Sequence, residues 1–500
     1  MNEHYPLLTL ISLMLFMGIL FYLVLKSRIK NESIETYALG SKSFSSFSVA
    51  LSLAASLTSA ATFIINPGFI ALYGLSAYLA FGVVMPLSIF VALVVLMKRF
   101  RQYGINVKSL TIADWVGKRY GSTFLKIFFG LLSTLLITFI VLICVGITKV
   151  LSKALNADEL TILIVLVVVV FSYMLAGGTN SMVYTNSLQA VMMIVVAIIL
   201  LGSGVEYLIS SGGEGIFERL AAIDPNLTTT FNSKSPLFRD FFEVVVCNAI
   251  VGIAIVCQPH ILTKSLLIKK NEQVNKFLTY SILILIVFFS VVITGFYARL
   301  NFPDLIYSGE LLKMDGIIPA YVVDRFPIYI GILVILGLIA AGLSTLEGLI
   351  QAIPTTLTND LIIPILGKYK KGITAIQINW AITFFVAVAS ILLSYQQLVS
   401  PSLSVGIFAQ NGVYAFFSAA FVPVFFGIFT KTTNVYVPIV ASLVAVLTHF
   451  GIYYLELTPY MDGATVKNPA IASAFAILAS TAAGTLIYYT KPMKSEAYAT

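Results

Sequence analysis

Hydrophobic residues fill the chain in stretches of about 20, and short polar segments separate one stretch from the next. A helix of that length crosses the hydrocarbon core of a bilayer and satisfies its own backbone hydrogen bonds there. The pattern therefore predicts an all-α membrane protein. We expect thirteen transmembrane helices near residues 5–26, 46–73, 76–97, 124–150, 159–177, 183–210, 240–262, 275–299, 327–358, 372–395, 402–430, 434–455 and 468–490.

The composition agrees with this class. Of the 500 residues, 59% are hydrophobic and only 10% are charged, whereas soluble proteins carry about 25% charged residues. The first stretch has neither a basic start nor a small-residue cleavage site, so we interpret it as a span and not as a signal peptide. Cys144, Cys247 and Cys257 lie in apolar stretches, which predicts small core residues rather than disulfides.

The distribution of Lys and Arg predicts the orientation. With the N-terminus outside, 21 of these residues fall on the cytoplasmic side and 9 on the other side. Cytoplasmic loops of membrane proteins carry the excess of positive charge. We therefore expect a multi-pass protein of the cell inner (plasma) membrane, with an external N-terminus and a cytoplasmic C-terminus. The net charge of +8 reflects these loops and does not indicate nucleic-acid binding.

Two stretches place small and hydroxylated residues in the middle of spans. They are Ala55-Ser56-Leu57-Thr58-Ser59 and Ala341-Gly342-Leu343-Ser344-Thr345. Small side chains leave backbone carbonyls accessible, and Ser and Thr add hydroxyl oxygens, which are the ligands that a hard cation such as sodium prefers. Irregular backbone at membrane depth is tolerated only where protein or a water-filled cavity faces it. The pair predicts an ion site shared by two helices.

The order of the spans predicts an inverted repeat. After the first span come two sets of five, and each set begins with a span broken by proline, at Asn66-Pro67-Gly68 and at Gln258-Pro259-His260. Transporters built from inverted repeats begin each half with such a broken helix. The expected domains are an N-terminal helix and linker (1–45), a first repeat (46–210), an external loop (211–239), a second repeat (240–430) and two peripheral helices with a short tail (431–500).

Five motifs, in order along the chain, resemble those of the sodium:solute symporter family, in its proline, pantothenate and acetate branch. They are Glu35-Thr36-Tyr37-Ala38-Leu39-Gly40 with Leu53-Ala54-Ala55-Ser56, Tyr173 to Gln189, Gln258-Pro259-His260-Ile261, Ala341 to Leu361, and Pro423 to Lys431. The resemblance runs from about residue 33 to residue 435. It implies sodium-coupled symport of a small organic solute (a monocarboxylate, an amino acid or a vitamin-like molecule) by alternating access, with no cofactor besides the coupling ion.

The resemblance also implies the sodium ligands. In the family, carbonyls of the first core helix and a carbonyl with two hydroxyls of the eighth hold the ion. At the matching positions this chain has Ala55, Thr58, Ala341, Ser344 and Thr345. The alternative is that Ser344 and Thr345 only bond to the backbone of their own helix.

Two positions depart from the family pattern. Where relatives commonly have an acid in the fifth helix, this chain has Asn186, and Glu347 stands in the eighth helix, where relatives often have a small polar residue. Glu347 lies three residues after Ser344 and so shares its helical face. A charge at the midplane costs about 2.5–3.5 kcal/mol, which makes Glu347 a coupling candidate. Asn186 is the other coupling candidate, because it replaces the usual acid. The alternative is that Glu347 reaches water near the inner end of its span.

By analogy with the family, the solute pocket lies among the first, third, sixth, eighth and tenth core helices. Its candidate polar residues are Ser59, Thr62, Gln258, Gln351 and Gln410. An apolar lining with few amides suits a small carboxylate or a compact neutral solute. Proline carriers of the family place aromatic residues on the third and sixth core helices. The corresponding stretch of the sixth helix here, 251–257, has none, which argues against proline as the solute. For His260 we expect a structural hydrogen bond to nearby backbone.

Two further hypotheses stay open. The same fold can be driven by protons, with Glu347 in place of the ion, or the chain can be a membrane solute sensor, although the short segment after residue 490 has no output domain. An enzyme is not expected, because the sequence has no nucleophile–base–acid set, metal-ligand cluster or nucleotide loop. The expected partners are sodium, a small organic solute and the bilayer, and no oligomeric state is predicted.

Three loop segments also carry expectations. Thr111-Ile112-Ala113-Asp114 has the spacing of a capping box, and Trp115, Val116 and Tyr120 are predicted to lie in the membrane interface. The external loops near 211–238 and 300–326 carry most of the external acids. We expect them to act either as lids or as solvated connectors.

Overall fold

The computed structural model describes residues 5–27, 33–40, 44–107, 109–209, 215–268, 270–366, 374–400, 404–430 and 434–490, without the side chains of 104–107. Several cations used for the orientation lie outside the described residues: Arg28, Lys30, Lys42, Lys108, Lys269, Lys368, Lys370, Lys371, Lys431, Lys491 and Lys494.

The described chain is almost entirely helical. Its helices are α1 (Tyr5–Ser27), α2 (Ile34–Leu39), α3 (Ser46–Leu57), α4 (Asn66–Tyr73), α5 (Leu75–Tyr78), α6 (Met85–Ala92), α7 (Lys98–Val107), α8 (Ile112–Arg119), α9 (Thr123–Leu132), α10 (Ile137–Leu155), α11 (Glu159–Gly202), α12 (Val205–Ile209), α13 (Ile216–Ile223), α14 (Asn248–Ala254), α15 (Pro259–Leu262), α16 (Gln273–Ser290), α17 (Thr294–Asn301), α18 (Ile317–Arg325), α19 (Ile328–Thr356), α20 (Ile363–Leu366), α21 (Ala375–Val399), α22 (Val405–Phe429), α23 (Tyr436–Leu455) and α24 (Pro469–Thr490). Strands β1 (Ile306–Tyr307) and β2 (Glu310–Leu311) form a small antiparallel hairpin.

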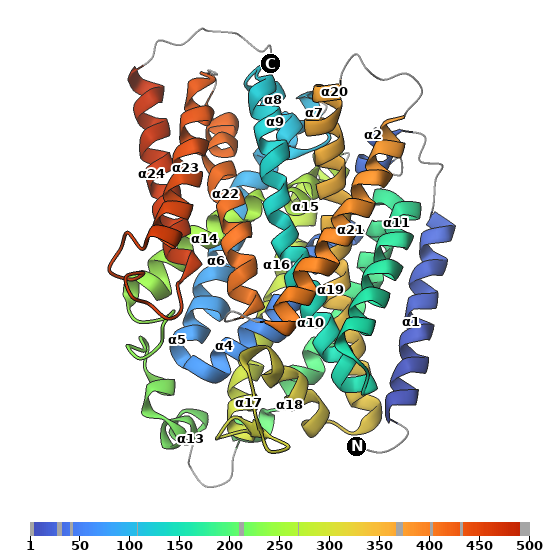
Figure 1. Ribbon diagram of the computed structural model, residues 1–500, viewed down its shortest axis with the longest axis vertical. Coiled ribbons are helices and arrows are strands. Elements are labelled where there is room, and N and C mark those ends of the chain that lie inside the picture. Colours follow the sequence, from blue (N-terminus) through green and yellow to red (C-terminus); the bar gives the residue numbers. More distant parts are fainter. Residues whose placement is uncertain are drawn as a thin grey trace.

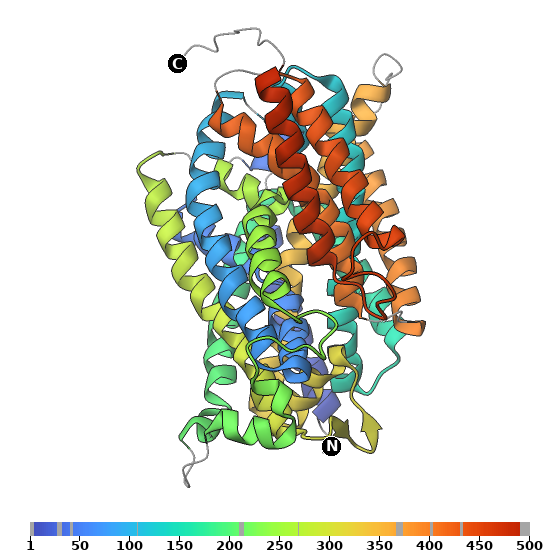
Figure 2. The same cartoon turned by 90° about the vertical axis from the view of Figure 1, so that its left-hand side faces the viewer.

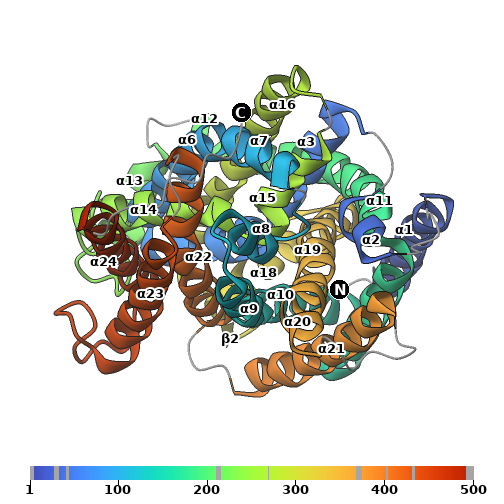
Figure 3. The same ribbon diagram turned by 90° about the horizontal axis from the view of Figure 1, so that it is seen from above.

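The long helices run along the longest axis of the molecule (Figure 1). In the described segments, ten helices are long and apolar enough to cross a membrane, and two bent helix pairs pass the same test. Helices α23 and α24 pack side by side at one edge (Figure 2). Seen from above, α15 and α19 lie near the middle, whereas α1, α16, α21 and α24 lie at the periphery (Figure 3). The chain is therefore a multi-span membrane protein with short, broken helices at its centre.

Both predicted broken helices are present, but the first break lies elsewhere than expected. Ser46–Leu57 meets Ala61–Tyr73 at 56°, and Phe242–Cys257 meets Pro259–Leu267 at 63°. The prediction that Asn66-Pro67-Gly68 forms the first break was wrong, because the chain leaves the helix at Thr58. Pro67 stands in the first turn of α4, directly after a π-helical turn, and a first-turn proline removes no hydrogen bond.

Helix α11 contains two spans. Its 44 residues would measure about 66 Å if straight, roughly twice the hydrocarbon thickness. Gly178 interrupts it with φ 68° and ψ −168°. Just before α11, the Lys153 ammonium lies 5.1 Å from the Tyr307 ring, and just after it, the Ser203 hydroxyl lies 2.9 Å from the Tyr321 hydroxyl. Both ends therefore approach the same 306–325 region, and the chain turns back at Gly178.

We predict that Gly178→Ala destabilises the protein by about 1–3 kcal/mol, because only glycine adopts these backbone angles without strain. The matched control is Gly202→Ala at the end of α11, where an added Cβ meets nothing within 4 Å. Thermal unfolding in detergent should show a lower Tm for the first variant only. Equal Tm values would mean that the turn tolerates a side chain.

Helix α8 packs against protein, so the prediction that Trp115, Val116 and Tyr120 lie in the membrane interface was wrong. All three side chains are buried. The indole of Trp115 packs on the Phe100 ring at 5.0 Å and fills the space beside Gly427 of α22. Arg119 donates from Nε to the Gly427 carbonyl at 2.8 Å, so its charge satisfies the end of α22 instead of facing lipid headgroups. The predicted cap at Thr111 is present, with Asp114 N donating to Thr111 Oγ1 at 2.9 Å.

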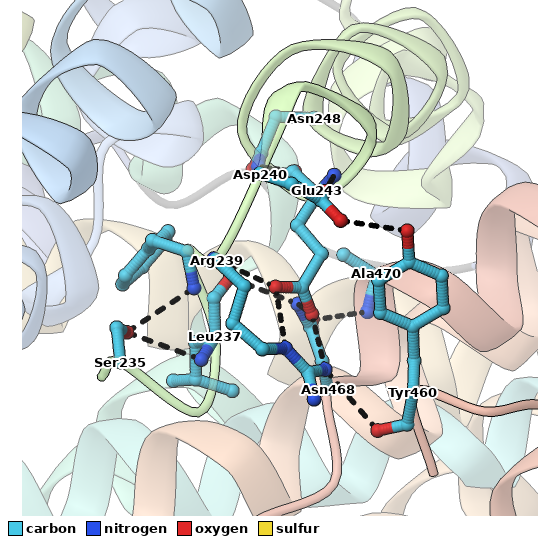
Figure 4. Close-up of polar contacts among 10 residues, drawn as sticks. Ser235, Leu237, Arg239, Asp240, Glu243, Asn248, Tyr460, Asn468 and Ala470 are labelled. Carbon is cyan, nitrogen blue, oxygen red and sulfur yellow. Dashed lines mark hydrogen bonds and ion pairs between the residues drawn. The ribbon is translucent and has the colours of Figure 1, made fainter. Parts of the chain in front are cut away.

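The segment that precedes the second broken helix is fastened to the connection between α23 and α24 (Figure 4). Arg239 donates from Nε to Glu243 Oε2 at 2.9 Å and from one terminal nitrogen to the Tyr460 carbonyl at 3.1 Å. Asn468 donates to Glu243 Oε1 at 3.2 Å, and the Tyr460 hydroxyl donates to Asp240 Oδ2 at 2.7 Å. These bonds tie the second repeat to the peripheral helices.

We predict a pH-dependent effect of Tyr460→Phe. The hydrogen bond to Asp240, together with burial, raises the pKa of Tyr460 from 10.0 to about 12. The protonated hydroxyl therefore stabilises the folded state fully below pH 10, and this contribution is lost as the pH rises through about 12. The variant should lose about 0.5–1 kcal/mol at pH 8, because water partly screens the bond. The Tm difference from the wild type should shrink at pH 11, and a constant difference would contradict this assignment.

Candidate ion and solute sites

The predicted ion ligands lie where α3 ends against the middle of α19. Since α3 stops at Thr58, the last carbonyls of the helix lack their usual amide partners. Ser344 Oγ of α19 donates to the Ala55 carbonyl at 2.8 Å and to the Ala341 carbonyl at 3.0 Å. Thr345 Oγ1 donates to the Ser56 carbonyl at 3.1 Å and to the Ala55 carbonyl at 3.4 Å.

These contacts bring together Ala55, Ala341, Ser344 and Thr345, all of them buried. Thr58 stands at the break beside them, and its own hydroxyl donates to the Ala54 carbonyl at 2.6 Å. The alternative that Ser344 and Thr345 bond only within their helix was wrong, because both reach carbonyls of α3. The group consists of neutral oxygens, and hydroxyls can turn to present lone pairs. Its chemistry fits a monovalent hard cation.

Glu347 is completely buried one helical turn further along α19. Its Oε1 accepts from the Tyr173 hydroxyl at 2.7 Å and from Gln189 Nε2 at 2.8 Å. Its Oε2 accepts from the Thr185 hydroxyl and, at 3.1 Å, from the amide nitrogen of Asn186. The alternative of a solvated acid near the helix end was therefore wrong. Four donors around one carboxyl group suit its ionised form.

Lys264 approaches the same group from the second broken helix. The charge count that predicts the orientation includes Lys264 among the loop cations of the cytoplasmic side, but the residue lies in the 3₁₀ turn η8 (Thr263–Leu267) and is buried. Its Nζ donates to Ser52 Oγ at 2.6 Å and lies 3.3 Å from the amide oxygen of Asn186. Asn186, the other coupling candidate, thus bridges Lys264 and Glu347. The sequence hints at this position, because Lys264 stands four residues after His260 and this spacing places both side chains on one side of a helix. Both side chains are buried.

A partly open cavity lies beside the first break. Four of the predicted solute residues line it: Ser59, Thr62, Gln258 and Gln410. The rest of the lining is mostly apolar and aromatic, with Phe81, Phe139 and Phe289 among its members. Neither Lys, Arg, Asp nor Glu lines this cavity in the part of the chain that the structure describes.

Gln351 lies apart from this cavity. It donates to the Ala38 carbonyl at 3.1 Å and lines a smaller space with Thr263 and Lys264. His260 faces that smaller space too, and neither ring nitrogen has a hydrogen-bond partner within the described ranges, so the expected backbone bond is not found there.

An ion cluster fastens the far end of α19. Lys126 Nζ lies 3.0 Å from Asp114 Oδ1 and 3.4 Å from Asp360 Oδ1, and Thr111 Oγ1 donates to Asp360 Oδ2 at 2.5 Å. Since Asp360 follows α19 and Asp114 belongs to α8, the cluster joins the segment after α19 to the α8–α9 hairpin.

Solved structures share this fold. A Na⁺-coupled sialic acid symporter in a substrate-bound, outward-open state matches with a TM-score of 0.78 and 16% identity, over 98% of this chain and 99% of that one. A nucleobase-cation-symport-1 family transporter in a closed conformation matches with a TM-score of 0.53 and 14% identity, over 92% and 96%. The likeness confirms the predicted architecture, a five-plus-five inverted-repeat core.

Sequence relatives define the class of protein that has this fold. The sodium/pantothenate symporter of Haemophilus influenzae is 25% identical over 439 residues, covering 86% of this chain and 85% of the relative. That of Escherichia coli is 25% identical over 462 residues, covering 89% and 91%. The profile of the sodium:solute symporter family matches residues 37–444, so the chain belongs to this family. It is a sodium-coupled symporter of a small solute.

Proposed function

We propose that the transported solute is a small monocarboxylate of the pantothenate type. The observation that carries the proposal is the cavity beside the first break. Its apolar lining is interrupted by three amides (Asn66, Gln258 and Gln410) and three hydroxyls (Ser59, Thr62 and Tyr414). Such donors can bind a carboxylate, an amide and hydroxyls, while the apolar walls receive the methyl groups of the solute. The names of the relatives at 25% identity agree with this chemistry.

Coupling between ion and solute follows from the chain connectivity. We propose that sodium binds the oxygens of Ala55, Thr58, Ala341, Ser344 and Thr345. Ser59 and Thr62 line the cavity, and they stand one and four residues after the proposed ligand Thr58 in the same broken helix. An ion that holds the end of α3 therefore orders the residues that contact the solute. The cycle then alternates between an outward-open and an inward-open form, in which the two repeats rock around the fixed site.

The membrane and the orientation belong to the proposal as well. We place the protein in the plasma membrane with the N-terminus outside, because 20 of the 30 basic residues, with the buried Lys264 left out, then fall on the cytoplasmic side. Single cysteines introduced at positions 3 and 496 should react with an impermeant reagent from opposite sides of the membrane. Labelling of both from one side would refute this orientation.

Binding of the solute can be tested directly. In proteoliposomes with an inward sodium gradient, we expect uptake of labelled pantothenate that excess unlabelled pantothenate abolishes. Gln410→Ala should raise KM about tenfold, since one hydrogen bond to a charged group is worth about 1.5–3 kcal/mol. The matched control is Gln396→Ala, a glutamine exposed on α21. Uptake of other carboxylates but not of pantothenate would overturn the identity of the solute and leave sodium coupling in place.

A further inference from the structure

Lys264 and Glu347 form a buried pair of opposite charges that the transport scheme above does not use. Lys264 lies in the second half of the second broken helix, and Glu347 lies in α19. Both side chains are buried. Asn186 contacts both, with its amide oxygen 3.3 Å from Lys264 Nζ and its amide nitrogen 3.1 Å from Glu347 Oε2. Charged side chains are expensive to bury inside a membrane, so such a pair indicates a role beyond packing.

The ammonium of Lys264 lies among oxygen atoms. It contacts Ser52 Oγ at 2.6 Å and the amide oxygen of Asn186 at 3.3 Å. Ser56 Oγ lies 2.9 Å from the same amide oxygen, and the amide nitrogen donates to Glu347. Without the ammonium, these residues would leave three neutral oxygens and one carboxylate in a buried pocket. An uncompensated buried anion of this kind favours a cation, and its oxygens suit sodium.

This oxygen pocket, formed by Ser52, Ser56, Asn186 and Glu347, adjoins the ion ligands. The carbonyl of Ser56 accepts a hydrogen bond from Thr345, while the hydroxyl of the same residue belongs to the pocket. Glu347 lies three residues after Ser344 on α19. The positive charge of Lys264 is therefore held a short distance from the place where sodium is proposed to bind.

We propose that the Lys264 ammonium is a tethered cation that fills the oxygen pocket beside Glu347 and excludes a second sodium ion from it. The protein then binds one sodium ion in each transport cycle. The inference rests on the proposed ion site between α3 and α19, and it is independent of which solute is carried.

The test is equilibrium binding of radioactive sodium to the purified, detergent-solubilised protein without solute. We expect one ion per chain for the wild type and for Lys264→Arg, which keeps the charge. Lys264→Gln should bind two ions, and Lys264→Gln combined with Glu347→Gln should bind one. The Ser344→Ala/Thr345→Ala variant should bind no sodium ion while Lys264 is present. The same variant with Lys264→Gln added should bind one sodium ion per chain.

Three results would overturn the proposal: two ions bound by the wild type, one ion bound by Lys264→Gln, or two ions bound by the double variant of Lys264 and Glu347. If Lys264→Gln unfolds, sodium should restore its Tm whereas choline should not, and failure of that rescue would also count against the proposal. An error in the identity of the solute would leave all of these ion counts unchanged. Persistence of one bound ion in Ser344→Ala/Thr345→Ala with Lys264 intact would instead refute the ion site itself.

Discussion

Replacing Ser344 and Thr345 together with Ala is expected to reduce sodium-dependent uptake at least tenfold while the protein still inserts and folds. The two hydroxyls supply the contacts that α19 makes to the carbonyls of Ala55 and Ser56. Alanine keeps the helix but removes both oxygens. A tenfold loss corresponds to about 1.4 kcal/mol, which is modest for two lost ion ligands. Uptake into proteoliposomes at graded sodium concentrations measures the effect.

The matched control replaces Ser281 and Thr383 with Ala. Among the residues that the structure describes, each of these buried hydroxyls bonds only within its own helix, Ser281 to the Phe277 carbonyl at 2.8 Å and Thr383 to the Asn379 carbonyl at 2.7 Å. The control variant should keep its sodium dependence. If the double variant at the ion site behaves in the same way, the assignment of Ser344 and Thr345 as ligands is refuted.

Glu347→Gln is expected to raise the sodium concentration for half-maximal uptake at least tenfold. The change leaves the ammonium of Lys264 without its counter-charge near the ion oxygens. At a separation of about 8 Å and an effective dielectric constant of about 20, one such charge weakens cation binding by about 2 kcal/mol. Adding Lys264→Gln should recover most of the affinity, because it removes the repelling charge.

The same variant separates the two roles considered for Glu347. If the residue balances charge, the pH profile of uptake should stay as in the wild type. If it carries a proton in place of sodium, Glu347→Gln should abolish pH-driven uptake and spare sodium binding, which would support the proton-driven hypothesis. Glu456→Gln, at an exposed acid paired with Lys467, serves as the control for loss of a carboxylate.

Much of the fold follows from the sequence because lipid imposes helices on every long apolar stretch. The meeting of the two small and hydroxylated stretches was also predictable, because both stand at midspan and offer complementary oxygens, and the structure brings Ser344 and Thr345 to the carbonyls of Ala55 and Ser56. The position of the first break was not predictable, because a proline in the first turn of a helix fits both a break directly before it, as at Pro259 of α15, and a helix that runs on from the residues before it. Pro67 stands inside that turn, and the break at Thr58 has no proline near it.

Two side chains show what the sequence pattern leaves out. Lys264 follows the apolar stretch of the second broken helix and has the appearance of a loop cation, yet its partners Ser52, Asn186 and Glu347 come from three other segments. Trp115 is a residue type that often lies in the membrane interface, yet its ring packs beside Gly427 of α22, where the missing side chain leaves room for it. Both outcomes depend on contacts between distant parts of the chain.

A lysine linked through Asn186 to a buried carboxylate also bears on how strongly the transporter can concentrate its cargo. In the proposed cycle the tethered pair is neutral, so the translocated charge is that of one sodium ion plus the solute. For a monovalent organic anion the sum is zero, and the membrane voltage, about 2.3 kcal/mol per charge at 100 mV, contributes nothing. The accumulation ratio is then limited by the sodium concentration ratio alone, about tenfold for each 1.4 kcal/mol of gradient. Lys264 would thereby keep import of a metabolic acid steady when the cell depolarises.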